Sequence, residues 1–264
     1  MHKVTIVKHT DQIDSLIQRF PCISGLKDKE IWEYDLDVVR DYFYGRRKDA
    51  PQNMKYRWKV PKQSFFGYQT QICALPVMFI GKTGYGKSSL LNHIIGKSVF
   101  LTDDTRPCTQ NVESVFFRLG SDPKYYLALF DFPGIGESEQ ADHKYMTWYA
   151  DMVKDSPCIV YVLRADQRDY SIDERAFEKL FSKEILDNVI IALNCADKIE
   201  PVNRKGEITE AQKEALEEKC DSIESILSVP SYRIFPCSAH TGYGMEELVS
   251  CIEDQLELCV YDKD

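Results

Sequence analysis

The sequence predicts an α/β fold, in which helices cover both faces of a mostly parallel sheet. From residue 73 onward, apolar strand patterns alternate with amphipathic helix patterns. A glycine-rich loop at 81–86 joins one of these strands directly to a helix. The strands expected at 112–119 and 125–130 are separated only by a short turn, so we expect them to form an antiparallel hairpin.

The first 70 residues follow a different pattern, which divides the chain into an N-terminal extension at 1–70 and a main domain at 71–264. In the extension, apolar residues at 13–20 have helical spacing up to Pro21. A second helix is expected from about Lys29 to Tyr44, and we expect both helices to pack on the main domain. Its apolar stripe is Trp32, Leu36, Val39 and Phe43.

The end of the extension, residues 46–68, is both basic and aromatic. Such stretches can bind RNA or phospholipid head groups. We favour the alternative of a solvated linker with buried aromatic rings, because charge runs usually face solvent. The residues concerned are Arg46, Arg47, Lys48, Lys55, Tyr56, Arg57, Trp58, Lys59, Lys62, Phe65, Phe66 and Tyr68.

The composition is that of an ordinary folded core, with 44% hydrophobic and 28% charged residues in a chain of 264. A net charge of −9 argues against a protein that coats nucleic acid, so we expect no DNA partner. The nine cysteines contain no CxxC pair, which favours a reducing compartment. We find no signal-peptide core and no apolar run of membrane-spanning length, and therefore expect a cytoplasmic protein.

The glycine-rich loop fits the phosphate-binding pattern GxxxxGK[ST] from Gly81 to Ser88. An apolar strand at 73–80 precedes it, and an amphipathic helix follows it. Glycines allow backbone N–H groups to turn inward around phosphate oxygens, and the helix start adds its positive dipole end. We expect Lys87 to reach the β- and γ-phosphates and Ser88 to offer its hydroxyl to Mg²⁺. The residues expected around the phosphates are Gly81, Thr83, Gly84, Tyr85, Gly86, Lys87, Ser88 and Ser89.

The later elements complete the alternation of strands and helices. Capping-box composition at 171–174 and 209–212 predicts where two helices begin. We expect helices near 144–154, from 171 to about 185, from the capping box at 209–212 to about 227, and at 245–256. Strands are expected at 158–163, 189–194 and 232–235.

Three groups of polar residues follow predicted strands, at the edge where open α/β sheets bind ligands. Asp131 is expected to hold Mg²⁺ through water, and the N–H of Gly134 to contact a γ-phosphate. Asp197 can accept two hydrogen bonds from the N1 and the exocyclic amine of guanine, a donor pair that adenine lacks. A backbone N–H within 238–240 can meet the guanine O6.

The motifs resemble those of the translation-factor-like GTPases, and within them the Era-like branch and its YfjP-type subgroup. The resemblance covers roughly residues 73–260. It is carried by Gly81–Ser88, Thr109, Asp131–Gly134, Asn194–Asp197 and Ser238–Ala239.

The resemblance implies a six-stranded sheet and Mg²⁺-dependent hydrolysis of GTP to GDP, coupled to a switch between two loop conformations. It implies a metal site at Ser88, Thr109 and Asp131, with Thr105 as the alternative to Thr109. It assigns Lys87, Thr109 and Gly134 to the reaction. The residues implied around the base are Asn194, Asp197, Lys198, Ser238, Ala239 and His240.

Four residues depart from the family pattern. Cys195 stands where the family has a lysine whose stem lies against the purine, and His240 replaces a second lysine, so base binding is expected to be looser. Ile135 replaces a water-positioning glutamine, so hydrolysis is expected to be slow unless a partner, a backbone group or a side chain such as Glu137 orients the water. Gly84 replaces an asparagine, and we expect little stimulation by potassium.

Two rival functions stay open at this point. A P-loop kinase or ATPase would use Lys87 and Ser88 but would leave Asn194, Asp197 and Ser238 without a role. A GTP-binding scaffold that oligomerises or docks a partner would need no turnover, and Ile135 is compatible with it. Beyond the nucleotide, we expect a protein or RNA effector or a nucleotide-dependent dimer.

Overall fold

The computed structural model describes residues 5–8, 30–35, 58–63, 69–96, 98–102, 109, 112–118, 125–153, 156–203 and 207–260. Their strands form one sheet in the order β1-β2-β5-β6-β4-β7-β8-β9, and β3 pairs with the first half of β4. The strands are β1 (Thr5–Lys8), β2 (Glu30–Asp35), β3 (Trp58–Gln63), β4 (Gln69–Gly81), β5 (Glu113–Arg118), β6 (Tyr125–Asp131), β7 (Cys158–Arg164), β8 (Val189–Asn194) and β9 (Ile234–Pro236).

The α/β fold is confirmed, and each individual strand that the sequence predicts is present in the sheet. β6, β4, β7, β8 and β9 run parallel, and β5 pairs with β6 as the antiparallel member of the hairpin. The expected total of six strands is too low, because the described residues contribute β1, β2 and β3 to the same sheet. β4 is also longer than predicted, since its first half pairs with β3.

The helix predicted from about Lys29 to Tyr44 is wrong where the structure describes it. Glu30–Asp35 is a strand, which pairs antiparallel with β1 on one side and β5 on the other. Its Ile-Trp-Glu-Tyr core suits a strand, and the open edge of β5 offers backbone partners that outweigh the helical spacing. The helix predicted at 13–20 lies outside the described residues. The division at residue 70 stays a prediction.

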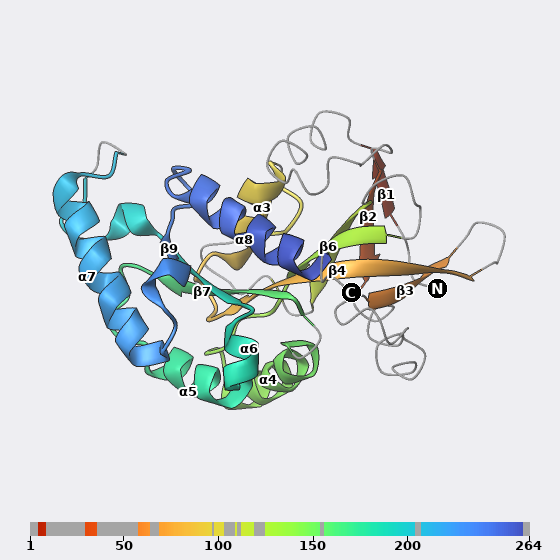
Figure 1. The fold of residues 1–264 in the computed structure, drawn as a ribbon, viewed down its shortest axis with the longest axis horizontal. Helices are drawn as coiled ribbons and strands as arrows, with labels where there is room; N and C mark the ends of the chain where they lie inside the picture. Colours follow the sequence, from red (N-terminus) through yellow and green to blue (C-terminus); the bar gives the residue numbers. More distant parts are fainter. Residues whose placement is uncertain are drawn as a thin grey trace.

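Helices lie on both faces of the sheet (Figure 1). α3 (Lys87–Ile95) and α8 (Met245–Val260) lie on one face, and α4 (Glu139–Val153), α5 (Ser171–Leu180) and α6 (Lys183–Leu186) lie on the other. α7 (Glu210–Leu227) contacts α5 and β9. Among the described residues, no helix combines the length and the apolar character that crossing a membrane requires.

One of the two predicted capping boxes is confirmed. Thr209 accepts the N–H of Gln212 and the Gln212 side chain accepts the N–H of Thr209 at the start of α7. The prediction at Ser171 is wrong, because Tyr170 precedes α5 and Ser171 is already helical. Asp169 instead accepts the N–H of Ser171.

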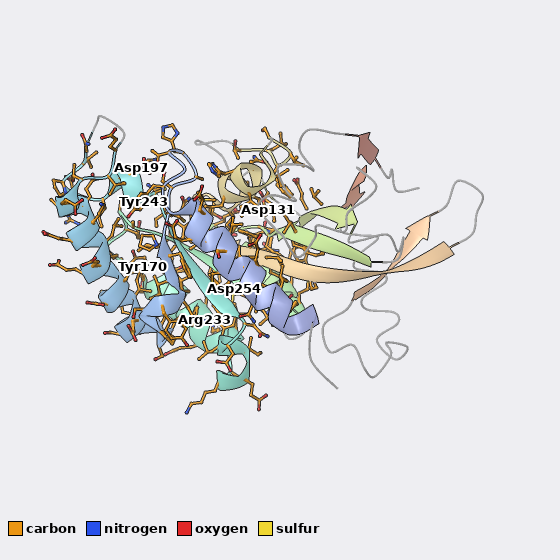
Figure 2. All side chains as sticks on the ribbon, turned by 45° about the horizontal axis from the view of Figure 1, so that its top comes forward. Asp131, Tyr170, Asp197, Arg233, Tyr243 and Asp254 are labelled. Atoms are coloured by element: carbon orange, nitrogen blue, oxygen red, sulfur yellow. The ribbon has the colours of Figure 1, made fainter. Side chains whose placement is uncertain are left out.

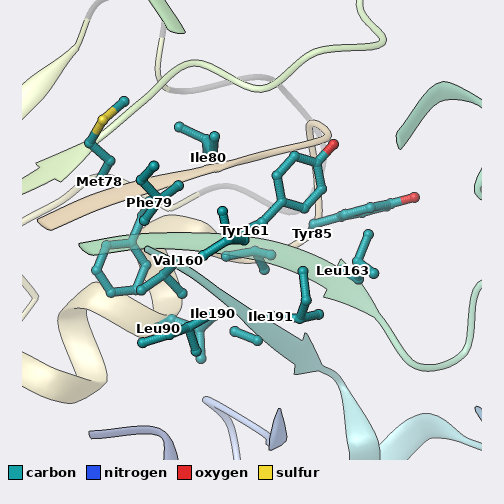
Figure 3. Close-up of a cluster of buried hydrophobic side chains, with 14 of the residues drawn as sticks. Met78, Phe79, Ile80, Tyr85, Leu90, Val160, Tyr161, Leu163, Ile190 and Ile191 are labelled. Atoms are coloured by element: carbon teal, nitrogen blue, oxygen red, sulfur yellow. The ribbon is translucent and has the colours of Figure 1, made fainter. Parts of the chain in front are cut away.

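The core lies between the central strands and the helices. Aliphatic side chains of β4, β7 and β8 are fully buried around Phe79 and Leu90, and the rings of Tyr85 and Tyr161 stand beside them (Figure 3). Because β4, β6, β7 and β8 are parallel, their carboxyl ends meet at one edge of the sheet. The predicted site residues follow these ends.

Candidate nucleotide-binding site

The glycine-rich loop at 81–86, called the phosphate loop from here on, connects the end of β4 to the start of α3, as the sequence predicts. Gly84 and Gly86 have φ angles of 77° and 86°, which favour glycine. A Cβ atom on Gly86 would also lie 2.4 Å from Nδ2 of Asn194. Glycine at this position therefore lets the loop approach the end of β8.

Lys87 lies inside the loop and is buried. Its Nζ donates to the carbonyl oxygens of Gly81 at 3.3 Å and Lys82 at 3.1 Å. Burial lowers the pKa of Lys87 from 10.5 to about 8, opposed by the charges of Asp131, Glu137 and Asp173. This arrangement holds an ammonium group inside the loop that is expected to surround the phosphates.

The three predicted metal ligands come together at the end of β6. Oδ2 of Asp131 accepts the hydroxyl of Ser88 at 2.5 Å and that of Thr109 at 3.2 Å, and the two hydroxyl oxygens are 3.4 Å apart. Asp131 is fully buried, and its other oxygen, Oδ1, has no hydrogen-bond partner among the described residues. A carboxylate with an unpaired oxygen beside two hydroxyls is the oxygen donor set that Mg²⁺ prefers, so the residues present fit this ion. Thr105 lies outside the described residues.

The loop after β6 packs directly on the phosphate loop. The N–H of Thr83 donates to the Ile135 carbonyl at 2.9 Å, and the N–H of Ile135 donates to the Gly81 carbonyl at 3.2 Å. A Cβ atom on Gly134 would lie 2.3 Å from the backbone nitrogen of Thr83. The hydroxyl of Thr83 also donates to Glu137 at 2.9 Å. Hydrogen bonds and close backbone packing therefore hold the loop after β6 against the phosphate loop.

Tyr149, on α4, is a contact that the sequence does not predict. Its hydroxyl donates to the Pro133 carbonyl at 2.5 Å and lies 3.3 Å from the Gly81 carbonyl. The side chain is fully buried, and burial raises its pKa. It joins the start of the phosphate loop to the loop after β6. Its position in an amphipathic helix indicated only that Tyr149 packs in the core.

Asn194, at the end of β8, links the phosphate side of the site to the base side. Its Nδ2 donates to the carbonyl of Tyr85 at 2.9 Å, and its Oδ1 accepts the N–H of Ala239 at 3.2 Å. Asn194 is buried. A guanine O6 that approached the Ala239 N–H would therefore have to compete with Asn194.

The predicted base-reading residues follow β8 and β9. Asp197 is half-buried, and its Oδ1 accepts the Ser238 hydroxyl at 2.7 Å. Lys198 and His240 are exposed. Asp131 and Asp197 both lie toward the top of the view in Figure 2, whereas Arg233 is labelled farther down.

Asp173 is a second contact that the sequence does not predict. It is buried in α5, where its carboxylate accepts the hydroxyls of Tyr85 and Tyr161 at 3.1 Å each. Burial raises the pKa of Asp173 to about 6, and both tyrosine hydrogen bonds oppose the change. Because Tyr85 belongs to the phosphate loop, this carboxylate fixes the loop to α5.

Residues 76–195, which contain most of this site, match the family described as 50S ribosome-binding GTPase. They form an Era-like P-loop GTPase domain. The protein YkfA of Escherichia coli (strain K12) is 28% identical over 182 residues, which are 67% of this chain and 62% of YkfA. YfjP of the same strain is 25% identical over the same lengths. These matches confirm the resemblance predicted from the motifs.

The GTPase domain is also similar to solved structures. Era in complex with MgGDPNP and nucleotides 1506–1542 of 16S ribosomal RNA is 22% identical with a TM-score of 0.54, over 70% of this chain and 57% of that one. At this identity, the similarity shows the fold. The chain spans less than two thirds of the length of these relatives.

Proposed function

We propose that this chain is a Mg²⁺-dependent guanine-nucleotide switch that hydrolyses GTP slowly to GDP and phosphate. The observation that carries the proposal is the contact of Ser88 and Thr109 with one oxygen of Asp131, next to the buried ammonium of Lys87. The Era structure with MgGDPNP supports the same ligands for a protein of this fold.

On the phosphate side, Lys87 and the loop N–H groups would neutralise the charge that develops on the γ-phosphate. Ser88, Thr109 and Asp131 would hold Mg²⁺, which supplies further positive charge when it is bound. On the base side, Asp197 would accept hydrogen bonds from guanine, with its carboxylate held by Ser238. The N–H of Gly134 would contact the γ-phosphate directly, and this contact would be lost when the phosphate leaves.

Slow turnover follows from Ile135, which is 2% exposed and cannot orient water. Glu137 is the side chain that can take this role, because it already accepts a hydrogen bond from Thr83 of the phosphate loop. The burial of Ile135 also favours the second candidate function, a GTP-binding scaffold with negligible turnover.

The partners proposed beyond the nucleotide are a protein or RNA effector and a nucleotide-dependent second copy of the chain. The RNA in the Era structure supports the first. We propose a cytoplasmic location, supported by free thiols at Cys158, Cys195, Cys220, Cys237 and Cys251, as expected in a reducing compartment.

Phosphate release from GTP tests the proposal, measured at long incubation times and at rising protein concentration. We expect slow Mg²⁺-dependent release by the unmodified chain and none by Lys87→Ala, which should still unfold cooperatively. GTP binding without release at every concentration would favour the scaffold. Tight GTP binding by Lys87→Ala would contradict the assignment of the phosphate loop.

A further inference from the structure

Arg164 is a charged residue at the site that none of the predicted motifs contains. It is the last residue of β7, and the sheet register places it beside Asn194 of β8. Its Nη1 donates to the carbonyl of Gly84 in the phosphate loop at 3.4 Å. Arg164 therefore brings a positive charge to the phosphate loop, beside the first residue of the base-binding motif Asn194–Asp197.

The edge of the Arg164 guanidinium is occupied by hydrogen bonds. Nε donates to Oδ1 of Asp166 at 2.9 Å, and Nη2 donates to Oδ2 of the same carboxylate at 2.6 Å. With Nη1 directed at Gly84, the in-plane contacts fix the orientation of the planar group and leave its two faces for stacking. Among the described residues, no aromatic ring lies over the guanidinium, and the side chain is 28% exposed.

Arg164 pairs in the sheet with Asn194, and the next residue, Cys195, is the one that replaces the motif lysine. Burial raises the pKa of the Cys195 thiol, and the positive charges of Arg164 and Lys198 oppose this effect. Cys195 itself has a φ of 61°, so it adopts a left-handed turn between Asn194 and the helical turn that carries Asp197. A short thiol at this turn cannot cover a purine ring as a lysine stem can.

We propose that Arg164 takes over the role of the missing lysine and lays one face of its guanidinium against the guanine ring. This proposal rests on the proposed function, because it requires that the site binds a guanine nucleotide. A planar cation whose edge is already paired is suited to the flat face of a base. Asp166 acts as a positioning residue, since it holds the guanidinium in one plane.

The test is GDP affinity, measured by calorimetry in the presence of Mg²⁺. Arg164→Ala is expected to weaken GDP binding about tenfold, the scale typical of a stacked arginine. Arg168→Ala is the matched control, because it removes the same charge from an exposed position in the loop that follows β7. Its GDP affinity should equal that of the unmodified chain.

A second substitution that restores GDP affinity distinguishes a contact between Arg164 and the base from mere support of the phosphate loop. Adding Cys195→Lys to Arg164→Ala should restore most of the lost affinity, because a lysine stem would then cover the base. Unchanged GDP affinity in Arg164→Ala would overturn the proposal, and so would a loss that Cys195→Lys does not rescue. If the unmodified chain binds no GDP, the proposed function fails instead.

Cys195→Lys alone provides a test that keeps Arg164, should Arg164→Ala fail to fold. If the guanidinium already covers the base, the added lysine should change GDP affinity by less than about twofold. A gain of about tenfold would show that the place of the lysine is vacant, and would overturn the proposal.

Discussion

Asn194 donates a 2.9 Å hydrogen bond from its side-chain amide to the backbone carbonyl of Tyr85, and so connects the end of β8 to the phosphate loop. Its side-chain oxygen accepts the Ala239 N–H after β9. One buried amide therefore holds three segments together: the phosphate loop, the end of β8 and the loop after β9.

Asn194→Ala is expected to weaken GDP binding by about tenfold or more, because the loops would lose their common anchor and leave buried groups unpaired. The measurement is GDP affinity by calorimetry. Asn188→Ala is the matched control: Asn188 precedes the opposite end of β8 and bonds Ser156 and Gln255. It should reduce stability by about 1–3 kcal/mol, on the order of the side-chain hydrogen bonds that it loses, and retain GDP affinity. Equal GDP affinity in both variants would contradict the anchoring role.

Gly134→Ala is expected to slow phosphate release at least about tenfold and to change GDP affinity little. The added Cβ would lie 2.3 Å from the Thr83 backbone nitrogen, so the loop after β6 would have to move away from the phosphate loop. Gly136→Ala serves as the control for backbone strain in the same loop, because Gly136 has a φ of 89° that disfavours alanine, but its Cβ would meet only the flexible side chain of Lys82. Both rates are measured from inorganic phosphate released. Unaltered release by Gly134→Ala would show that the close packing of the loops is not needed.

Glu137→Gln is expected to lower the rate of phosphate release by about tenfold or more, because an amide is a poor base for orienting water. GTP affinity should stay the same. The control is Glu139→Gln, the same change at an exposed position two residues later. If Glu137→Gln and the unmodified chain release phosphate equally fast, another group positions the water.

Asp173→Asn is expected to alter how stability depends on pH. Because the folded-state pKa of about 6 exceeds the ordinary value of 3.8, the folded chain binds more protons between these values. The contribution of Asp173 to stability is therefore present below about pH 4 and is lost as the pH rises through 6. This difference corresponds to roughly 3 kcal/mol.

The check on Asp173 is urea unfolding at several pH values between 4 and 7, without nucleotide or metal. The variant should lack most of the decline seen in the unmodified chain. Tyr85, Tyr161 and Lys82 all face Asp173 and remain in the variant. Parallel pH profiles for the two proteins would contradict the account.

The sequence predicts the GTPase domain well because its signals are local. A strand, a glycine loop and an amphipathic helix are adjacent in the chain, so the geometry around Lys87 and Ser88 follows from spacing alone. The approach of Asp131 to Ser88 followed from the rule that carboxyl ends of parallel strands share one edge. Thr109 follows no strand, and its contact with Asp131 was implied by the family resemblance.

Other features depend on contacts that spacing does not carry. Trp32 begins a stripe of apolar residues at helical intervals, yet its strand Glu30–Asp35 pairs with β5, which is far away in the sequence. Asp173 belongs to the predicted helix start at 171–174, where only Ser171 and Glu174 had an expected role, yet its carboxylate accepts hydrogen bonds from two tyrosines of other elements. Arg164 lies outside every motif, and only its position at the end of β7 would have indicated from the sequence that it lies at the site.

We propose that one carboxylate, Asp197, selects guanine in a site whose phosphate loop would bind any nucleoside triphosphate. The most direct measurement is competition among GTP, ATP and xanthosine triphosphate, with Mg²⁺, for the unmodified chain and Asp197→Asn. We expect the unmodified chain to prefer GTP strongly, and Asp197→Asn to lose GTP affinity and gain affinity for xanthosine triphosphate. Equal affinity of the unmodified chain for GTP and ATP, or an unchanged preference in the variant, would contradict the proposal.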